Sequence, residues 1–355
     1  MKRNQPNDKH SVELVYADTP QNRGLLQRLE RLSKPFAPTP WLFNEHLQLV
    51  WLGLKKTFAP AMQYDKVQDV RAADGGLTQL HWLGLDLPLA TPTLVVLHTI
   101  SGSHHSMRGL VRDLHQLTGW RVVVCQRRGH GGQPLGAKRF NTMGDVDDLD
   151  AQLKRIQQMV PGSPLYAVGV SAGTGLLIRH LGEKQYETPF KAAYAYCPGY
   201  DIRTAFQRAR PFYSAGMTKK LLKTFILPNA STFRAFESYT KLVAARDLEM
   251  FHRHLYQCAG YESYDAFIAA CNPVNVMDQV KIPVLILNAE DDPVCVAENV
   301  DEHKADIAKL PSVILAVTRK GSHCAHYAGW SATPWAHHLA AEYFQAQHAL
   351  SQTSV

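Results

Sequence analysis

The chain has 355 residues, of which 45% are hydrophobic and 19% are charged, so it can bury a large core. Its net charge is +7, but the lysines and arginines are scattered beyond residues 1–3, which argues against nucleic acid as a partner. No window approaches the roughly 18 uncharged apolar residues that a membrane-spanning helix needs. Residues 1–14 also lack the apolar centre of a signal peptide.

The six cysteines form no Cys-X-X-Cys pair and show no regular spacing. Cys125, Cys197 and Cys295 fall in or beside apolar stretches that are typical of strands, where a free buried thiol is the usual state. This pattern favours a reducing compartment, and we expect a cytoplasmic protein. The sequence gives no reason to expect a metal or a cofactor.

Residues 1–35 are polar, and they are predicted to be an amino-terminal extension whose start is expected to be loosely ordered. Residues 41–54 are mostly apolar but are broken by Asn44, Glu45 and His46. For this stretch, packing on the domain is favoured over an alternative in which it lies on a lipid surface. Residues 64–84 alternate weakly around Asp-Gly-Gly at 74–76, which predicts a hairpin.

Farther along the chain, apolar strands alternate with helices. Helices are predicted at 106–117 and 141–160, and strands at 93–97, 121–125, 164–168, 191–197, 283–288 and 312–317. Continuous apolar strands separated by helices are typical of a mostly parallel sheet that is buried on both faces. We therefore predict an α/β fold.

Residues 201–270 interrupt this alternation. They hold 12 of the 33 aromatic residues, and they show short amphipathic helices at 217–225 and 233–248 without a clear strand. We predict that they are a helical insertion into one α/β core. The predicted division is an extension at 1–35, the core at 36–200 and 271–347, the insertion at 201–270, and a tail at 348–355.

Residues 169–173 read Gly-Val-Ser-Ala-Gly, between the predicted strand 164–168 and a helix-forming segment. Glycines on both sides of Ser171 let the strand and the helix approach closely, and the helix start brings backbone N–H groups to the serine. The pattern predicts a nucleophile elbow with Ser171 as the nucleophile. The alternative is a glycine-rich turn that only packs a helix on a sheet.

A serine hydroxyl is a poor nucleophile and needs a base, which in turn needs an orienting acid. After a nucleophile elbow the acid and then the histidine are expected at the ends of later strands. We assign the acid to Asp291, because it lies three residues after Asn288, the predicted end of its strand. Asp292 is the alternative, and a turn-capping role for the Asp-Asp-Pro sequence is also open.

The base is assigned to His323, which follows the predicted strand 312–317 and is preceded by Gly321 in a position to bend the loop. His326 and His98 fit this position less well. A metal site formed by His323 and His326 is disfavoured, because no further carboxylate or thiolate stands at ligand spacing.

An oxyanion hole should be built from two backbone N–H groups. One belongs to Ala172, directly after the nucleophile. The other is expected from the loop after the strand 93–97, where Ile100 is the candidate donor and Thr99 could add its hydroxyl. The alternative for this loop is a polar cap of the following helix.

Several stretches resemble one family, the ABHD1/ABHD2/ABHD3, YheT and plant Emb8-like α/β-hydrolases. Residues 40–48, Pro-Trp-Leu-Phe-Asn-Glu-His-Leu-Gln, are similar to its amino-terminal signature. The Arg-Arg-Gly-His-Gly-Gly at 127–132 and the Gly-Asp-Val-Asp-Asp-Leu at 144–149 resemble two further motifs. The nucleophile elbow, Asp-Asp-Pro at 291–293 and Gly-Ser-His at 321–323 follow in the same order.

The resemblance implies an α/β-hydrolase fold: a mostly parallel sheet of the eight-stranded type, helices on both faces and a helical cap. It also implies a serine esterase or lipase with Ser171, Asp291 and His323 as the triad, acting on medium-chain esters, monoacylglycerols or phospholipids. Because the aromatic-rich insertion is expected to roof the site, we predict short- to medium-chain acyl esters or acylglycerol-like lipids as substrates. The chain departs from the family at 98–99, where His-Thr replaces His-Gly, and at 322, where serine replaces glycine.

Two other functions stay open. One is an acyltransferase that uses the same triad, in which an alcohol replaces water. The other is a catalytically weak binding protein of the same fold, which the Cβ of Thr99 at the oxyanion loop favours. An ester or lipid is the expected partner, and peripheral contact with a membrane is a further alternative. The oligomeric state is not predicted.

Overall fold

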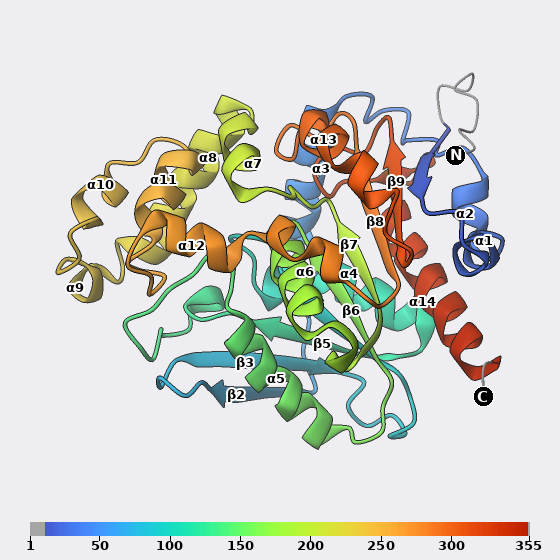
Figure 1. Cartoon of the computed structure of the whole chain (residues 1–355), viewed down its shortest axis with the longest axis horizontal. Helices are drawn as coiled ribbons and strands as arrows, with labels where there is room; N and C mark the ends of the chain where they lie inside the picture. The colour runs from blue at the N-terminus through green and yellow to red at the C-terminus, as the bar shows by residue number, and fades with distance from the viewer. Residues whose placement is uncertain (1–10, 354–355) are drawn as a thin grey trace.

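A computed structural model describes residues 11–353 (Figure 1). Its centre is one nine-stranded sheet in the order β1-β9-β8-β7-β6-β4-β5-β3-β2. The strands from β9 to β5 in this order run parallel, whereas β1, β3 and β2 are antiparallel to their neighbours. The strands are β1 (Glu13–Tyr16), β2 (Lys66–Arg71), β3 (Leu77–Leu83), β4 (Thr93–Leu97), β5 (Arg121–Gln126), β6 (Leu165–Val170), β7 (Phe190–Tyr196), β8 (Val284–Ala289) and β9 (Val313–Thr318).

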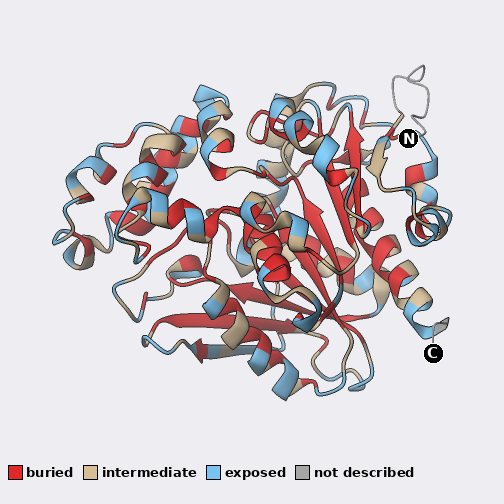
Figure 2. Cartoon of the chain, viewed as in Figure 1, coloured by how far each residue is buried: buried red, intermediate tan, exposed pale blue. Residues whose placement is uncertain are grey.

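The central strands are apolar along their whole length because helices cover both faces of the sheet. On one face, α4 (His104–Thr118) and α14 (Trp335–Thr353) pack on β5 and β7. On the other face lie α5 (Val146–Met159), α6 (Ala172–Lys184) and α13 (Ala297–Ile307). Figure 2 shows the buried sheet between helices whose outer surfaces are exposed. The predicted α/β fold is confirmed.

The predicted hairpin at 64–84 is present as β2 and β3, and the six predicted strands after it correspond to β4 to β9. The helix expected at 141–160 begins later, at Val146. Asn141 closes a turn before it: its side-chain oxygen accepts from the N–H of Met143, and its amide donates to the carbonyl of Gly144. A local side-chain bond of this kind competes with helix formation.

The chain between β7 and β8 is helical, and Figure 1 shows much of it to one side of the sheet. Its helices, called the β7–β8 helices below, are α7 (Ile202–Arg208), α8 (Pro211–Leu221), α9 (Ala230–Phe233), α10 (Tyr239–Val243), α11 (Leu248–Leu255) and α12 (Tyr264–Cys271). The single helix expected at 233–248 is not formed. The Asp247 side chain accepts from the N–H of Met250 and so begins a new helix, α11.

Short helical turns connect these elements. They are the 3₁₀ turns η1 (His130–Gly132), η2 (Gln185–Glu187), η4 (Pro273–Asn275) and η5 (Met277–Gln279), and the π-helical turn η3 (Leu222–Ile226). A small ladder of β10 (Tyr327–Ala328) and β11 (Thr333–Pro334) precedes α14.

The amino-terminal segment belongs to the core from residue 13 onward, which corrects the prediction of an extension that ends at residue 35. Strand β1 pairs with β9 at the sheet edge. Helices α1 (Pro20–Leu26) and α2 (Glu30–Ser33) follow, and Leu25, Leu29 and Leu32 join the same apolar cluster as α14. A four-residue strand gives too short a pattern to be recognised. Residues 1–10 lie outside the described range.

Residues 41–54 lie mostly on α3 (Glu45–Phe58), which both packs and faces solvent. Leu42, Leu47 and Trp51 contact a small cluster around Tyr327. Other apolar side chains of this stretch are exposed, among them Val50 and Phe58. Within residues 11–353, no helix combines the length and apolar character that crossing a membrane requires.

Because the amino-terminal segment is buried, we predict that truncating one of its core side chains destabilises the protein. The Leu29→Ala substitution removes a side chain that is 0% exposed, and we expect it to lower the free energy of unfolding by about 2–5 kcal/mol. Urea denaturation followed by circular dichroism measures this change. Arg28→Ala, at the exposed neighbouring position, is the matched control and should change stability by less than about 0.5 kcal/mol. Equal stability of the two variants would contradict this assignment.

Candidate active site

Ser171 lies in a sharp turn between β6 and α6. Its backbone has φ 52° and ψ −121°, a conformation that a residue with a side chain adopts only under strain, at a cost of about 1–3 kcal/mol. The N–H of Ser171 donates to the carbonyl of Tyr196 at the end of β7, which holds the turn on the sheet. This geometry matches the predicted nucleophile elbow.

The glycines of the elbow are required by close backbone contacts. A Cβ on Gly173 would overlap the carbonyl oxygen of Leu97 at the end of β4. A Cβ on Gly169 would lie 2.8 Å from the carbonyl oxygen of Gly173. Any larger residue at these two positions would push α6 away from the strand ends and displace Ser171.

Ser171, His323 and Asp292 form one connected set. His323 Nε2 lies 2.9 Å from Ser171 Oγ, and His323 Nδ1 lies 2.8 Å from Asp292 Oδ2. The other carboxylate oxygen of Asp292 accepts from the N–H groups of Val294 at 2.7 Å and Cys295 at 2.8 Å. The Asp292 side chain is fully buried, and that of His323 is 13% exposed. Hydrogen bonds therefore hold both carboxylate oxygens of Asp292 in place.

Asp291, the residue predicted to contact His323, does not do so. Its carboxylate accepts from the N–H of Ser322 at 2.8 Å and lies 3.6 Å from Lys320 Nζ. The physical reason is the end of β8, which extends to Ala289, one residue beyond the predicted Asn288. The offset of three residues then leads to Asp292, the alternative that the sequence had left open.

The charge balance at His323 follows from these contacts. Burial alone would lower the pKa of His323, but the Asp292 carboxylate and the nearby sulfur atoms of Cys324 and Cys295 raise it well above its usual value. Burial raises the pKa of Asp291. Because the buried Asp292 carboxylate lies beside it, the His323 imidazole can hold a proton that it takes from Ser171.

The other two histidines considered in the sequence have different partners. His326 Nδ1 lies 3.1 Å from Tyr196 Oη, and its Nε2 lies 3.0 Å from Thr318 Oγ1. His98 Nε2 accepts from the N–H of Arg127 at 3.1 Å. Burial lowers the pKa of each of these histidines. Neither imidazole is hydrogen-bonded to Ser171, and His326 is not paired with His323.

The predicted oxyanion residues lie beside Ser171, with one difference. Ile100 and Ala172 line the same cavity as Ser171. Ala172 is the first residue of α6, where backbone N–H groups have no acceptor within the helix. Thr99 is not among the residues that line the cavity. A Cβ on Gly102 would lie 2.6 Å from Thr99 Oγ1, so that hydroxyl is directed toward its own loop.

Comparisons with known proteins agree with this geometry. Residues 90–327 match the model of the family described as "Serine aminopeptidase, S33". The chain belongs to this family of α/β-hydrolases. The resemblance to the ABHD hydrolases and the predicted α/β-hydrolase fold are thereby confirmed, and the chain is an enzyme of the hydrolase class.

Two relatives and one solved structure illustrate the similarity. Phospholipase ABHD3 of Mus musculus is 26% identical over 324 residues, covering 88% of this chain and 78% of the relative. Medium-chain fatty acid ethyl ester synthase/esterase 2 of Saccharomyces cerevisiae is 26% identical over 289 residues, covering 73% and 62%. A hyperthermophilic esterase from the archaeon Pyrobaculum calidifontis superposes with a TM-score of 0.53 at 15% identity, covering 96% and 100%.

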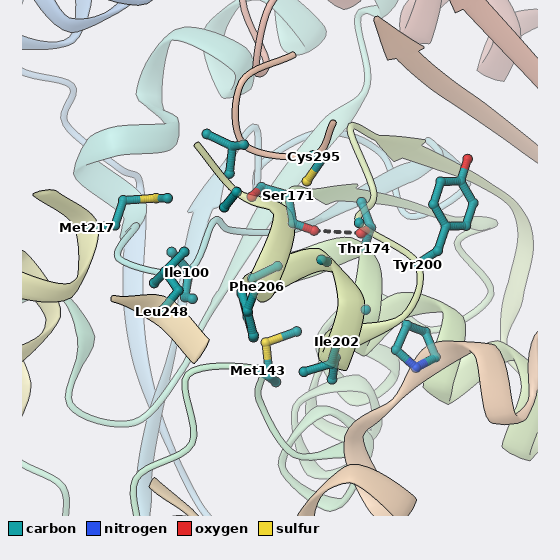
Figure 3. A pocket seen from close by; sticks show the side chains of 17 residues that line it. Ile100, Met143, Ser171, Thr174, Tyr200, Ile202, Phe206, Met217, Leu248 and Cys295 are labelled. Atoms are coloured by element: carbon teal, nitrogen blue, oxygen red, sulfur yellow. Dashed lines mark hydrogen bonds between the residues drawn. The ribbon is translucent and has the colours of Figure 1, made fainter. Parts of the chain in front are cut away.

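The hydrolase has an apolar cavity at Ser171 (Figure 3). Loops at the strand ends and the β7–β8 helices both contribute to its wall. Figure 3 shows the side chains of Ile100, Met143, Phe206, Met217 and Leu248 around the space in front of the serine. None of the 17 lining residues carries a charge. An uncharged apolar group therefore fits this cavity best.

A buried arginine supports the oxyanion loop, and the sequence analysis had not assigned it this role. Arg127 Nη2 donates to the carbonyl oxygen of Thr99 at 2.6 Å. Burial lowers the pKa of Arg127 to about 9, against the opposing effect of Asp145. Its neighbour Arg128 bonds both carboxylate oxygens of Asp148. The Arg-Arg-Gly motif was the available signal, but a motif alone does not say which carbonyl an arginine reaches.

Three cysteines surround His323. Ligand atoms of Cys197, His323 and Cys324 lie within 4.8 Å of one another, and the same is true of Asp292, Cys295 and His323. Both ring nitrogens of His323 already bond to Ser171 and Asp292, so we assign no metal to these groups. All six cysteines are free thiols, and Cys324 is the one that is not fully buried.

Proposed function

We propose that this α/β-hydrolase cleaves carboxylic esters with a triad of Ser171, His323 and Asp292. The observation that carries the proposal is the pair of short contacts on either side of the His323 ring, 2.9 Å to Ser171 Oγ and 2.8 Å to Asp292 Oδ2. This arrangement suits nucleophilic acyl transfer, because the imidazole is placed to accept the serine proton while a buried carboxylate holds the required tautomer.

In the proposed reaction, Ser171 Oγ attacks the ester carbon while His323 Nε2 takes its proton. The Asp292 carboxylate stabilises the imidazolium that forms. His323 then protonates the departing alcohol, which leaves an acyl group on Ser171. Water enters, gives a proton to His323 and attacks the acyl carbon, releasing the acid and restoring the serine.

The negative charge on the substrate oxygen would be stabilised by the N–H groups of Ala172 and Ile100. The first turn of α6 adds the positive end of its helix dipole at the same point. Loss of one such donor typically lowers kcat about a hundredfold to a thousandfold. The contact of Arg127 with the Thr99 carbonyl supports a fixed position for this loop.

The cavity supports an ester or lipid substrate over a peptide. An aminopeptidase must bind the charged amino terminus of its substrate, and a buried cation needs an anionic partner. The uncharged lining of the cavity offers none. The printed names of the mouse and yeast relatives refer to a phospholipase and to medium-chain ethyl esters. We propose short- to medium-chain acyl esters or acylglycerol-like lipids, bound beneath the β7–β8 helices acting as a cap.

An acyltransferase is the second candidate, because the yeast relative is named both synthase and esterase. The same acyl-serine would then react with an alcohol instead of water. Product analysis in the presence of ethanol separates the two: ester formation in excess of acid favours transfer, and acid alone favours hydrolysis.

The first test concerns Ser171. We expect the wild-type protein to react with a fluorophosphonate probe and to hydrolyse p-nitrophenyl esters, with the highest rate at medium chain length. Ser171→Ala should lose labelling and at least about a thousandfold in kcat, because the nucleophile is absent. Ser331→Ala, at an exposed serine, is the control and should keep both. A folded wild-type protein that does not react with the probe would instead support the binding-protein alternative.

The second test separates the two adjacent carboxylates. Asp292→Asn should lower kcat by about a thousandfold to ten-thousandfold, whereas Asp291→Asn should lower it by less than about tenfold. The Asp292 carboxylate raises the pKa of His323, and activity is lost as pH falls through that pKa. The acid limb of kcat/KM in Asp292→Asn should therefore shift to lower pH. A larger loss in Asp291→Asn would overturn the assignment of the acid.

Peripheral contact with a membrane is also proposed, from an exposed apolar stripe on and before α3. Val50, Leu54 and Phe58 follow one another at helical spacing and are 59%, 43% and 78% exposed, and Phe43 before the helix is 69% exposed. Lys55 lies on the same helix, is exposed and suits anionic headgroups. The cytoplasmic location stays a prediction.

The stripe is tested by co-sedimentation with vesicles of phosphatidylcholine and phosphatidylglycerol. The double variant Val50→Ser/Phe58→Ser should weaken binding at least about tenfold, because each side chain contributes roughly 1.5–3 kcal/mol when it leaves water. Leu227→Ser, at a 53% exposed leucine outside the stripe, is the matched control. Equal binding of the wild type and the double variant would refute this surface.

A further inference from the structure

Two cysteines meet behind the catalytic histidine. Cys197 directly follows β7, and Cys324 directly follows His323. The N–H of Cys324 donates to Cys197 Sγ at 3.3 Å, and the two sulfur atoms lie within 4.8 Å of each other. To form a disulfide, the two sulfur atoms must close to the bonding distance of about 2.0 Å.

The pair is accessible from a side of the molecule that the proposed reaction does not use. Cys324 lines a pocket between α3 and α4, and Ser171 is not among its lining residues. Lys56 lines the same pocket, and burial lowers the pKa of its ammonium group. Cys197 is completely buried behind Cys324. A small solute can therefore reach Cys324 first and Cys197 only through it.

The surroundings of Cys324 favour its ionised form. Burial alone would raise the pKa of this thiol, but the hydrogen bond with Cys197 lowers it, and a proton on His323 lowers it further. Burial raises the pKa of Cys197 well above its usual value. The thiolate is the form that reacts with peroxides, so the two cysteines differ in reactivity.

We propose that Cys324 is a peroxide-reactive thiol and that Cys197 resolves it into a reversible disulfide that inhibits the hydrolase. The Cys324 thiolate attacks one oxygen of hydrogen peroxide, and the O–O bond breaks. Hydroxide departs, and Cys324 becomes a sulfenic acid. The sulfur of Cys197 then attacks the sulfenic sulfur, and its proton leaves with the hydroxyl group as water. A dithiol reductant returns both residues to thiols.

The expected inhibition follows from the position of the pair. Cys324 is the residue next to His323 in the chain, so a movement that brings the sulfur atoms together also shifts the backbone that holds the imidazole at Ser171. Both cysteines have positive φ, 54° and 59°, which shows that the chain is already constrained there. A displacement of about 1 Å at a catalytic group can cost roughly a hundredfold in rate. This effect on turnover rests on the proposed function, whereas disulfide formation does not.

The experiment treats the reduced full-length protein with hydrogen peroxide in the presence of a metal chelator. Free thiols are then alkylated, and the protein is digested and analysed by mass spectrometry. We expect a peptide that links Cys197 to Cys324, with the loss of two hydrogen atoms, and its disappearance after dithiothreitol. Activity on a p-nitrophenyl ester should fall at least about tenfold and recover with the reductant.

Three variants define the assignment. Cys197→Ser should stop the reaction at the sulfenic acid, which dimedone traps on Cys324, and Cys324→Ser should prevent the link. Cys295→Ser is the matched control, because Cys295 also lies beside His323 but faces the Ser171 cavity; it should form the link as the wild type does.

Absence of the linked peptide from the peroxide-treated wild type would overturn the proposal, as would oxidation at Cys295 in its place. A linked peptide without any change in activity would overturn the inhibition. Because the mass measurement needs no turnover, a protein that forms the disulfide but hydrolyses no ester would contradict the proposed function alone.

Discussion

The close contact between the start of α6 and the end of β4 is the constraint on which the site depends. Only glycine at position 173 lets the helix meet the carbonyl of Leu97, and this contact holds the turn in which Ser171 adopts its strained backbone. The same contact sets the distance from Ala172 to the loop that carries Ile100. Elements that are far apart in sequence thus converge because the ends of parallel strands share one edge of the sheet.

The sequence was sufficient for the parts of the fold that have strong local patterns. The apolar strands, the hairpin at Asp-Gly-Gly and the elbow at Ser171 each have a physical signature that lies within a few neighbouring residues. The contact of His323 with Ser171 was also predictable, because a histidine is expected after the last strand of this fold, close to the nucleophile elbow. These features need no knowledge of distant contacts.

The remaining features depend on contacts that the sequence does not display. The choice between Asp291 and Asp292 turned on a single residue at the end of β8, and strand ends are the least certain part of any such prediction. Strand β1 is four residues long, and only its pairing with β9 identifies it as a strand. Cys197 and Cys324 are in contact although more than a hundred residues separate them, and neither local sequence indicates this contact.

The pairing of β1 with β9 has a consequence for the order of folding. Glu13 is aligned with Val317, so the first strand of the chain has no partner until nearly all of the protein has been synthesised. At about 5–20 residues per second, this delay is roughly 15 to 60 s on the ribosome. The sheet can therefore assemble from the β2–β3 edge toward β9 as the strands emerge, and β1 closes the opposite edge only after β9 has left the exit tunnel.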